Sequence, residues 1–232
     1  MTFTTLTLPF CNIPLSISHY AFSALTCAVG QQLLNEYMPT DFYAWKPVRR
    51  SSFLAGRAAV KQWQKVFAET SFIVPKAVDG SPHWPDGWLG SISHCTDEAI
   101  AVLYFQREDI QPKALLGLGV DVEYLSQAKQ LKATEDLLCV ASERLLIRDQ
   151  GYDLESELLV LFSIKESIYK AIYPSLRRFV DFLEVEVILL NSQGHWCARP
   201  RAALAKELDQ KCELFGVFWQ KQGKCYSVCG WV

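Results

Sequence analysis

The sequence has no apolar run long enough to cross a membrane, since runs such as residues 158–162 fall far short of the ~20 residues that a bilayer requires. It also lacks the basic start and continuous apolar stretch of a secretory signal peptide. Basic residues are not in excess, because 23 Lys and Arg stand against 25 Asp and Glu, a net charge of −2. We therefore expect a cytoplasmic protein with no transmembrane segment and no broad face for nucleic acid.

Cysteine pairs with CxxC spacing are absent, although the chain holds eight cysteines. Without a secretory signal, these cysteines are expected to be reduced and mostly buried, with a structural zinc site as the alternative. Repeats and low-complexity tracts are absent too, and the composition is globular, with 50% apolar, 12% aromatic and 21% charged residues. A chain of 232 residues has room for one large domain or two small ones, and we expect a monomer.

Helical and strand-like patterns predict an α+β fold with antiparallel strands and no regular βαβ alternation. Helices are predicted over residues 23–38, 51–67, 135–149 and 155–173, with Pro174 stopping the last. Strands are predicted over residues 90–93, 99–105, 115–125, 185–190, 194–198, 213–220 and 224–231. A helix-then-strands order occurs once on each side of about residue 110, which predicts two similar halves, residues 1–110 and residues 111–232.

Asp121 and Glu123 stand in the motif GVDVE, inside an otherwise apolar strand. Because side chains alternate along a strand, both carboxylates lie on one face, and Val120 and Val122 lie on the other, buried face. Neighbouring carboxylates raise each other's pKa unless a cation lies between them, and Mg²⁺ or Mn²⁺ suits that position. The alternative is a strand edge whose acidic face is solvated.

Glu166 lies in the stretch LLVLFSIKESIYKAIY, a predicted helix that is apolar nearly all round and must be largely buried. At ~100° per residue it shares a face with Leu159, Phe162 and Tyr173. A buried carboxylate needs a positive partner, and Lys170, one turn on, can supply it as an i,i+4 pair. The second interpretation makes Glu166 a third metal carboxylate and Lys170 a contact for phosphate oxygens.

Basic residues gather in one segment, although the chain as a whole is slightly acidic: Lys46, Arg49, Arg50, Arg57 and Lys61. Arg50, Arg57 and Lys61 are seven and four positions apart, so they share a helical face that is either solvated or binds phosphate. His94 directly follows a short strand in GSISHC, where it is either structural or a donor to phosphate. Together these groups predict a multiply phosphorylated substrate, a divalent metal and a lysine near the transferred phosphoryl group.

Five motifs of the chain, in this order, resemble those of the phosphopantetheinyl transferases of the surfactin-synthetase-activating type, above all the siderophore-pathway members. The motifs are RRSSFLAGRAA, a G-x-P-x-W-P turn at residues 80–85, GSISHC, GVDVE and FSIKESIYKA. The likeness covers nearly the whole chain. One departure is Ser81, which stands where several relatives carry a basic residue before the proline.

The resemblance implies two α+β halves related by a pseudo-twofold axis, with the active site between them. The implied reaction moves the 4′-phosphopantetheine arm of coenzyme A to a serine of an apo carrier protein and releases 3′,5′-ADP. The likeness to siderophore-pathway members favours aryl or peptidyl carrier domains of nonribosomal peptide synthesis as partners. A metal-dependent nucleotide or pyrophosphate hydrolase and a non-catalytic coenzyme A-binding subunit are the alternatives.

Matching motif to motif then implies a role for each candidate residue. Mg²⁺, or Mn²⁺ in its place, would be held by Asp121, Glu123 and Glu166. Glu166 would also be the base for the carrier serine, directly or through water, and Lys170 would neutralise charge on the transferred phosphoryl group. The 3′-phosphate of coenzyme A would be held by Arg50, Arg57 and His94, and the nucleotide pocket would be lined by Gly80, Ser81, Pro82 and Ser93. Coenzyme A binding would thus belong to the first half, and the metal and catalytic residues to the second.

Overall fold

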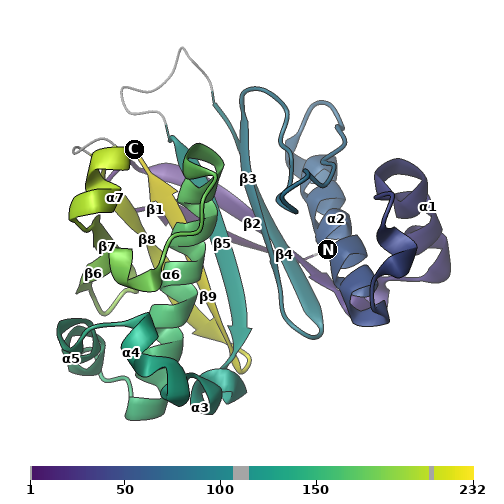
Figure 1. Cartoon of the computed structure of the whole chain (residues 1–232). Helices are drawn as coiled ribbons and strands as arrows, with labels where there is room; N and C mark the ends of the chain where they lie inside the picture. The colour runs from purple at the N-terminus through teal and green to yellow at the C-terminus, as the bar shows by residue number, and fades with distance from the viewer. Residues whose placement is uncertain (1, 107–114, 209–211) are drawn as a thin grey trace. The chain divides into compact units, whose positions relative to one another are not determined.

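The protein's structure is a computed structural model that describes residues 2–106, 115–208 and 212–232 (Figure 1). The chain divides into two compact units, unit 1 (Met1–Leu6 and Pro14–Arg107) and unit 2 (Thr7–Ile13 and Glu108–Val232). The predicted boundary between residues 110 and 111 lies outside the described residues. That boundary and the pseudo-twofold relation between the halves stay predictions.

Unit 1 holds a four-stranded sheet in the order β1-β2-β4-β3, with helix α2 packed on it. Its elements are β1 (Thr2–Leu8), β2 (Ile13–Ala21), α1 (Cys27–Tyr37), α2 (Pro47–Phe67), β3 (Trp88–His94) and β4 (Glu98–Phe105). Small residues let the helix approach the sheet closely, since a Cβ at Gly56 would lie 2.9 Å from Ile92 Cγ2. Ser18 Oγ of β2 also donates a hydrogen bond to the backbone oxygen of Ala59 at 2.7 Å. Helix α2 is therefore fixed against both β2 and β3.

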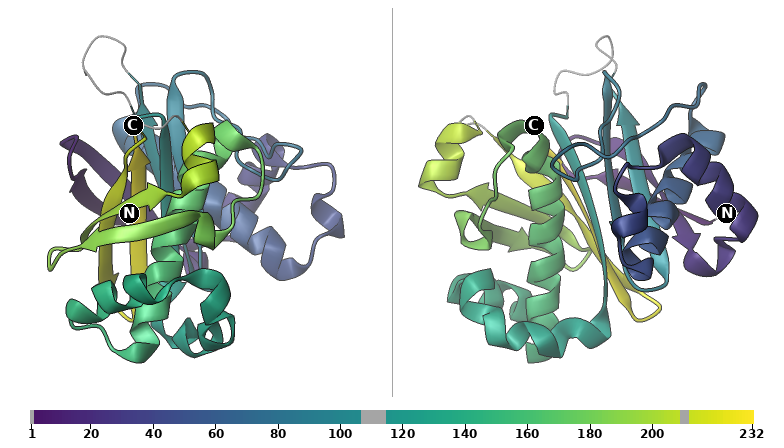
Figure 2. Two further views of the ribbon diagram at one scale, coloured as in Figure 1. Left: turned by 60° about the vertical axis from the view of Figure 1, so that its left-hand side comes forward. Right: turned by 45° about the vertical axis from the view of Figure 1, so that its right-hand side comes forward.

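Unit 2 holds a five-stranded antiparallel sheet in the order β5-β9-β8-β7-β6. Its strands are β5 (Gly117–Tyr124), β6 (Val185–Leu190), β7 (His195–Pro200), β8 (Leu214–Lys221) and β9 (Lys224–Trp231). Its helices are α3 (Ala128–Leu131), α4 (Glu135–Leu138), α5 (Ala141–Asp149), α6 (Leu154–Leu176), the short 3-10 helix η5 (Phe182–Glu184) and α7 (Ala202–Glu207). The long helix α6 packs on β5 and β9, and both views of Figure 2 show it running beside these strands.

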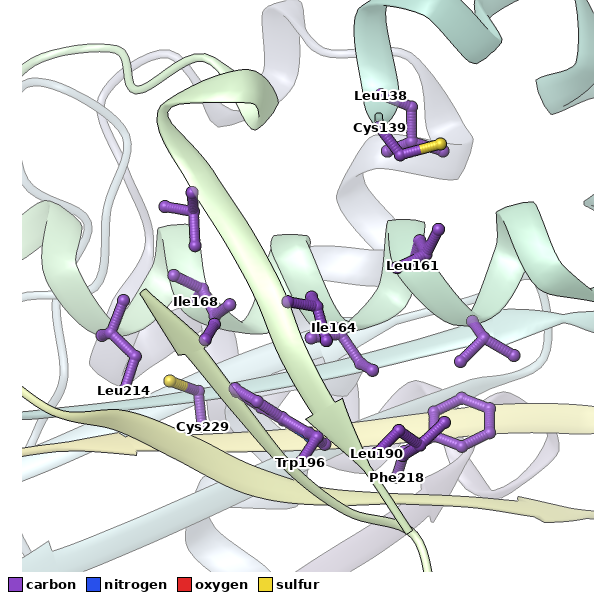
Figure 3. Packing of buried hydrophobic residues seen from close by; sticks show 14 of the residues in the cluster. Leu138, Cys139, Leu161, Ile164, Ile168, Leu190, Trp196, Leu214, Phe218 and Cys229 are labelled. Carbon is purple, nitrogen blue, oxygen red and sulfur yellow. The ribbon is translucent and has the colours of Figure 1, made fainter. Parts of the chain in front are cut away.

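The core of unit 2 lies between α6 and the sheet (Figure 3). Helix α6 contributes Ile164 and Ile168, and the strands contribute Trp196, Phe218 and Cys229, all of them at most 1% exposed. Burying a large apolar side chain of this kind contributes ~1.5–3 kcal/mol. These contacts hold α6 on the sheet, but apolar burial is non-directional and defines the rotation of the helix only loosely.

The predicted α+β fold with antiparallel sheets is confirmed. The sequence patterns did not predict strands β1 and β2 or the short helix α7. The single helix predicted over residues 135–149 is wrong, because α4 and α5 are separate helices. The break arises where the Glu143 carboxylate accepts a hydrogen bond from Val140 N at 2.9 Å and so caps the start of α5.

The prediction that Pro174 stops the long helix is also wrong, because α6 continues to Leu176. A proline so near the end removes only one hydrogen bond of the last turn. Arg177, at φ 54°, ends the helix in the left-handed conformation, and its N–H donates to the backbone oxygen of Tyr173.

Two further expectations can be compared with the structure: that no segment spans a membrane, and that the cysteines are mostly buried. No helix within the described residues is both long and apolar enough to cross a membrane. All eight cysteines lie in the described ranges, where Cys95, Cys139, Cys225 and Cys229 are buried but Cys27 is exposed. The other three are half-buried, so the prediction that the cysteines are mostly buried holds for four of the eight.

Candidate active site

The two carboxylates of strand β5 lie on the face that α6 covers. Gly119, on the same face, lets the two elements meet, since a Cβ there would lie 1.8 Å from the backbone oxygen of Ser167. The Asp121 side chain is only 2% exposed, and Glu123 is half-buried. Because the Asp121 side chain is almost fully buried, the alternative of a solvated acidic strand face is wrong for Asp121.

Lys170 of α6 lies against these carboxylates. Its Nζ donates to Asp121 Oδ1 at 2.6 Å and lies 3.9 Å from Glu166 Oε2. The i,i+4 pair of Glu166 and Lys170 therefore exists, but the shorter contact joins residues 49 positions apart in the sequence. The side chains of Glu166 and Lys170 are 27% and 25% exposed, so both are open to a ligand from solvent, whereas Asp121 is enclosed.

Burial and like charge perturb the ionisable groups of this cluster. Burial, and then the Asp121 carboxylate, raise the pKa of Glu123 to about 8, with Lys170 acting in the opposite direction. Burial also raises the pKa of Glu166 against the opposing effect of Lys170. Burial alone would lower the pKa of Lys170, but the carboxylates of Asp121 and Glu166 outweigh it and raise that pKa. Lys170 therefore stays an ammonium, while Glu123 and Glu166 bind protons more tightly than ordinary carboxyls.

The acidic cluster (Asp121, Glu123 and Glu166) offers the oxygen donors that Mg²⁺ and Mn²⁺ prefer. A divalent cation would also favour the ionised form of Glu123, whose pKa burial and Asp121 raise to about 8. In this structure, Asp121 Oδ1 accepts a hydrogen bond from Lys170 Nζ. Among residues 2–106, 115–208 and 212–232, no group of three or more His, Cys, Asp or Glu is arranged to hold a metal ion. The donor chemistry fits the cation, and the three-carboxylate metal site stays a prediction.

Arg57 of α2 is a buried cation in unit 1. The residue is 5% exposed, and its guanidinium carbon lies 4.5 Å from the centroid of the Phe53 ring. Within the described part of the chain, its Nε has no hydrogen-bond partner. Burial lowers the pKa of Arg57 to about 10, Tyr37 opposes this effect, and the positive charge of Arg49 adds to it. A buried guanidinium in such surroundings is costly unless an anion joins it, which indicates an anion-binding position.

The predicted basic face of Arg50, Arg57 and Lys61 is only partly formed. Arg57 is buried, so a solvated helix face is wrong at that position, whereas Arg50 is half-buried and stays partly in solvent. Lys61 forms an ion pair with Glu36 of α1 and lies 5.8 Å from the centroid of the Tyr37 ring. Its charge is therefore already neutralised within the protein.

Local hydrogen bonds close the turn that contains Gly80, Ser81 and Pro82. The Asp79 carboxylate accepts hydrogen bonds from the backbone N and the Oγ of Ser81, at 2.9 and 2.6 Å. Trp84 ties the turn to strand β3, because a Cβ at Gly90 would lie 2.7 Å from its ring. The turn is thereby joined to the strand that carries the GSISHC motif.

Ser93 and His94 lie on opposite faces of β3, since side chains alternate along a strand. Ile92 approaches Gly56 of α2, so the exposed His94 lies on the face of β3 that α2 covers. Ser93 is 6% exposed and belongs to the other face. The structure therefore brings His94, but not the Ser93 side chain, to the side of the sheet that holds Arg57.

The sequence patterns did not single out Lys165 or the apolar cavity beside it. Lys165 directly precedes Glu166, is 2% exposed, and forms an ion pair with Glu143 at 2.8 Å. The cavity has a volume of about 420 Å³ and is lined mainly by apolar side chains, among them Phe162 and Phe182. A lysine inside a helix that is apolar nearly all round was the available signal for a buried ion pair.

Comparison with protein families gives two matches on this chain. Residues 44–104 match the 4′-phosphopantetheinyl transferase N-terminal domain, and residues 117–219 match the 4′-phosphopantetheinyl transferase superfamily. Together the two matches cover more than half of the chain. The first includes Arg57 and His94, and the second includes the whole acidic cluster and Lys170.

Several curated proteins are similar to this chain. Enterobactin synthase component D of Salmonella typhimurium is 34% identical over 125 residues, which are 53% of this chain and 48% of that protein. Enterobactin synthase component D of Escherichia coli O157:H7 is 29% identical over 180 residues, 76% of this chain and 74% of that protein. The 4′-phosphopantetheinyl transferase PptT of Mycobacterium tuberculosis is 26% identical over 154 residues, 65% of this chain and 63% of that protein. The chain thus spans about half the length of the Salmonella relative that it matches.

Solved structures show more distant likenesses. The ACPS-CoA complex of Chronobacterium ammoniagenes covers 52% of this chain and 98% of its own, at 20% identity and a TM-score of 0.43. Holo-[acyl-carrier-protein] synthase (AcpS) of Helicobacter pylori in complex with coenzyme A covers 50% of this chain and 99% of its own, at 15% identity and a TM-score of 0.38.

Proposed function

The chain belongs to the 4′-phosphopantetheinyl transferase superfamily, and on that premise we propose that it transfers the 4′-phosphopantetheine arm of coenzyme A to a serine of an apo carrier protein. The serine oxygen forms a bond to the phosphorus that carries the arm, the pyrophosphate P–O bond breaks, and 3′,5′-ADP leaves. The similarity to proteins named Enterobactin synthase component D supports aryl or peptidyl carrier domains of siderophore synthesis as the partners.

One contact carries this proposal, the 2.6 Å hydrogen bond from Lys170 Nζ to Asp121 Oδ1. It joins the FSIKESIYKA helix to the GVDVE strand, so the two motifs form one charged cluster with Glu166 at its open side. Phosphoryl transfer requires little covalent chemistry from a protein and much positioning and charge neutralisation. An ammonium among three carboxylates, partly open to solvent, supports chemistry of that kind.

In the proposed reaction, Glu166 accepts the proton of the carrier serine, directly or through a water. Its raised pKa supports this role, because a general base is most effective when its pKa lies near the working pH. Lys170, kept protonated by its carboxylate neighbours, donates hydrogen bonds to the transferred phosphoryl group. Asp121, Glu123 and Glu166 would hold Mg²⁺ or Mn²⁺, which when bound neutralises charge on the pyrophosphate.

The residues proposed to bind coenzyme A belong to unit 1. Arg57, together with Arg50 and His94, would hold the 3′-phosphate, and the lack of a hydrogen-bond partner at Arg57 Nε among the described residues supports this role. A guanidinium fork suits phosphate because it donates paired, charge-assisted hydrogen bonds. The nucleotide pocket would be lined by Gly80, Ser81 and Pro82, with Ser93 contributing its backbone, because its side chain lies on the other face of β3.

Intact mass measurement of an apo carrier protein, incubated with coenzyme A and Mg²⁺, tests the proposal. A gain of one phosphopantetheine arm supports the transferase. Breakdown of coenzyme A without carrier would identify a metal-dependent hydrolase instead, and no change in either molecule would identify a non-catalytic coenzyme A-binding subunit. A carrier whose acceptor serine is replaced by alanine is the matched control. Aryl, peptidyl and fatty-acid carriers tested in parallel decide the partner class.

A further inference from the structure

Lys165 lies in the helix motif directly before Glu166, yet its ammonium is buried inside the protein. Its Nζ donates to the backbone oxygen of Leu138 at 2.9 Å and to that of Phe182 at 3.0 Å. It also donates to Glu143 Oε2 at 3.0 Å. An ammonium carries three donors, and these three acceptors occupy them. Lys165 therefore has no donor left for a substrate phosphate.

Glu143 is buried as completely as its partner, at 1% exposure. Its Oε2 accepts a hydrogen bond from Val140 N at 2.9 Å, and its Oε1 accepts one from Val187 N at 2.8 Å. The Lys165–Glu143 pair thus ties α6 to the end of α4, the start of α5, η5 and strand β6. Each of these bonds is directional, as are the bonds that Ser227 Oγ and Trp231 Nε1 of β9 donate to the α6 backbone, at 2.5 and 3.1 Å. The bonds from β9 hold the face of α6 that lies on the sheet, whereas the Lys165–Glu143 pair holds α6 to α4, α5, η5 and β6.

We propose that the Lys165–Glu143 pair is a positioning pair that helps to set the rotation of α6 and so places Glu166 and Lys170 against Asp121 of β5. This inference rests on the proposed transferase function. Side chains reach ~5–6 Å from a helix axis, so a roll of ~10° would move the Glu166 carboxylate by ~1 Å. A misplacement of ~1 Å can lower a rate ~100-fold.

The test compares Lys165→Met, Glu143→Gln and the double variant with a matched control on the same helix. Glu157 is the control, because it is 0% exposed and ion-paired with Arg144 and Arg148. It lies nine positions before Glu166, ~13 Å along the helix. Glu157→Gln therefore disturbs a buried ion pair of α6 away from the acidic cluster.

The variants are measured at a temperature where circular dichroism shows them folded. We expect Lys165→Met and Glu143→Gln each to lower kcat for carrier modification roughly tenfold to hundredfold, with losses that overlap in the double variant. The Mg²⁺ concentration for half-maximal rate should rise in both. The affinity for coenzyme A, measured by calorimetry without Mg²⁺, should not change. Glu157→Gln should unfold at a lower denaturant concentration and keep the wild-type kcat.

Three results would overturn the positioning role. Weaker coenzyme A binding in Lys165→Met but not in Glu143→Gln would make Lys165 a phosphate ligand. Wild-type kcat in folded Lys165→Met and Glu143→Gln would leave the pair a purely structural role. An equal loss of kcat in Glu157→Gln would show a general effect of destabilising α6. If Lys165→Met does not fold, the milder Glu143→Gln decides alone. Wild-type protein that modifies no carrier overturns the proposed function instead, before any variant is compared.

Discussion

Replacing Arg57 with methionine should stabilise the ligand-free protein while weakening coenzyme A binding. Burial lowers the pKa of Arg57 to about 10, from an ordinary value of ~12.5. Because one pKa unit corresponds to ~1.4 kcal/mol, the charge costs the folded protein ~3 kcal/mol. The folded pKa lies below the unfolded one, so this cost is fully present at any pH below about 10 and does not vary near neutrality.

The net effect of Arg57→Met is smaller than that cost. The guanidinium carbon lies 4.5 Å from the centroid of the Phe53 ring, and a desolvated cation–π contact is worth ~1–2 kcal/mol. A gain of ~1 kcal/mol or more remains, which raises the melting temperature by ~2–4 °C for a chain of this length. Loss of a charge-assisted contact to the 3′-phosphate should cost ~1.5–3 kcal/mol, or roughly tenfold to hundredfold in affinity.

Thermal unfolding without ligand, and calorimetric titration with coenzyme A and with dephospho-coenzyme A, measure the two effects. Dephospho-coenzyme A lacks the 3′-phosphate, so its affinity should change less than that of coenzyme A. Lys61→Met on the same helix is the control, since Glu36 already neutralises Lys61 and both ligands should respond alike. A lower melting temperature of ligand-free Arg57→Met, or equal losses for both ligands, would refute the reasoning.

Four further substitutions test the acidic cluster and the strand that carries two of its carboxylates. Asp121→Ala should remove detectable carrier modification and leave the circular dichroism spectrum unchanged; near-wild-type activity in excess Mg²⁺ would exclude the three-carboxylate site. Glu166→Gln and Lys170→Gln should each lower turnover by about a hundredfold, less than additively when combined, as expected for groups acting on one transition state. Only Glu166→Gln should raise the Mg²⁺ needed for half-maximal rate, and a double variant with near-wild-type turnover would return both residues to a structural role. Gly119→Ala should lower the free energy of unfolding by ~3 kcal/mol or more, because its Cβ would lie 1.8 Å from the backbone oxygen of Ser167; denaturant unfolding close to wild type would contradict that close approach.

Most of the fold follows from patterns of short range. Residues 224–231 belong to a short, mostly apolar run, which predicts a strand, and β9 has those bounds. Strand β2 was not predicted, because Pro14 at its second position argues against a strand, although a proline can stand at the start of one. The break between α4 and α5 was not predicted either. The Glu143 carboxylate caps the start of α5, and Lys165 of another helix holds that carboxylate in place.

Local sequence patterns were enough to identify the groups of the candidate site and to show which of them share a face. The alternation of a strand places Asp121 with Glu123, and one helical turn places Glu166 with Lys170. These relations depend only on the local geometry of the backbone. They hold in the structure for that reason.

Which faces meet depends on how the helices and strands pack. Lys170 could bond to Glu166 in any helix, but its 2.6 Å hydrogen bond goes to Asp121, because α6 lies directly over β5 at Gly119. Arg57 has the spacing of a solvated helix face, and its burial depends on how α2 packs on the sheet of unit 1. Lys165 finds its partner Glu143 across 22 positions of sequence. Periodicity sets the direction in which a side chain points, whereas its partner depends on which element packs there, and that is a property of the whole fold.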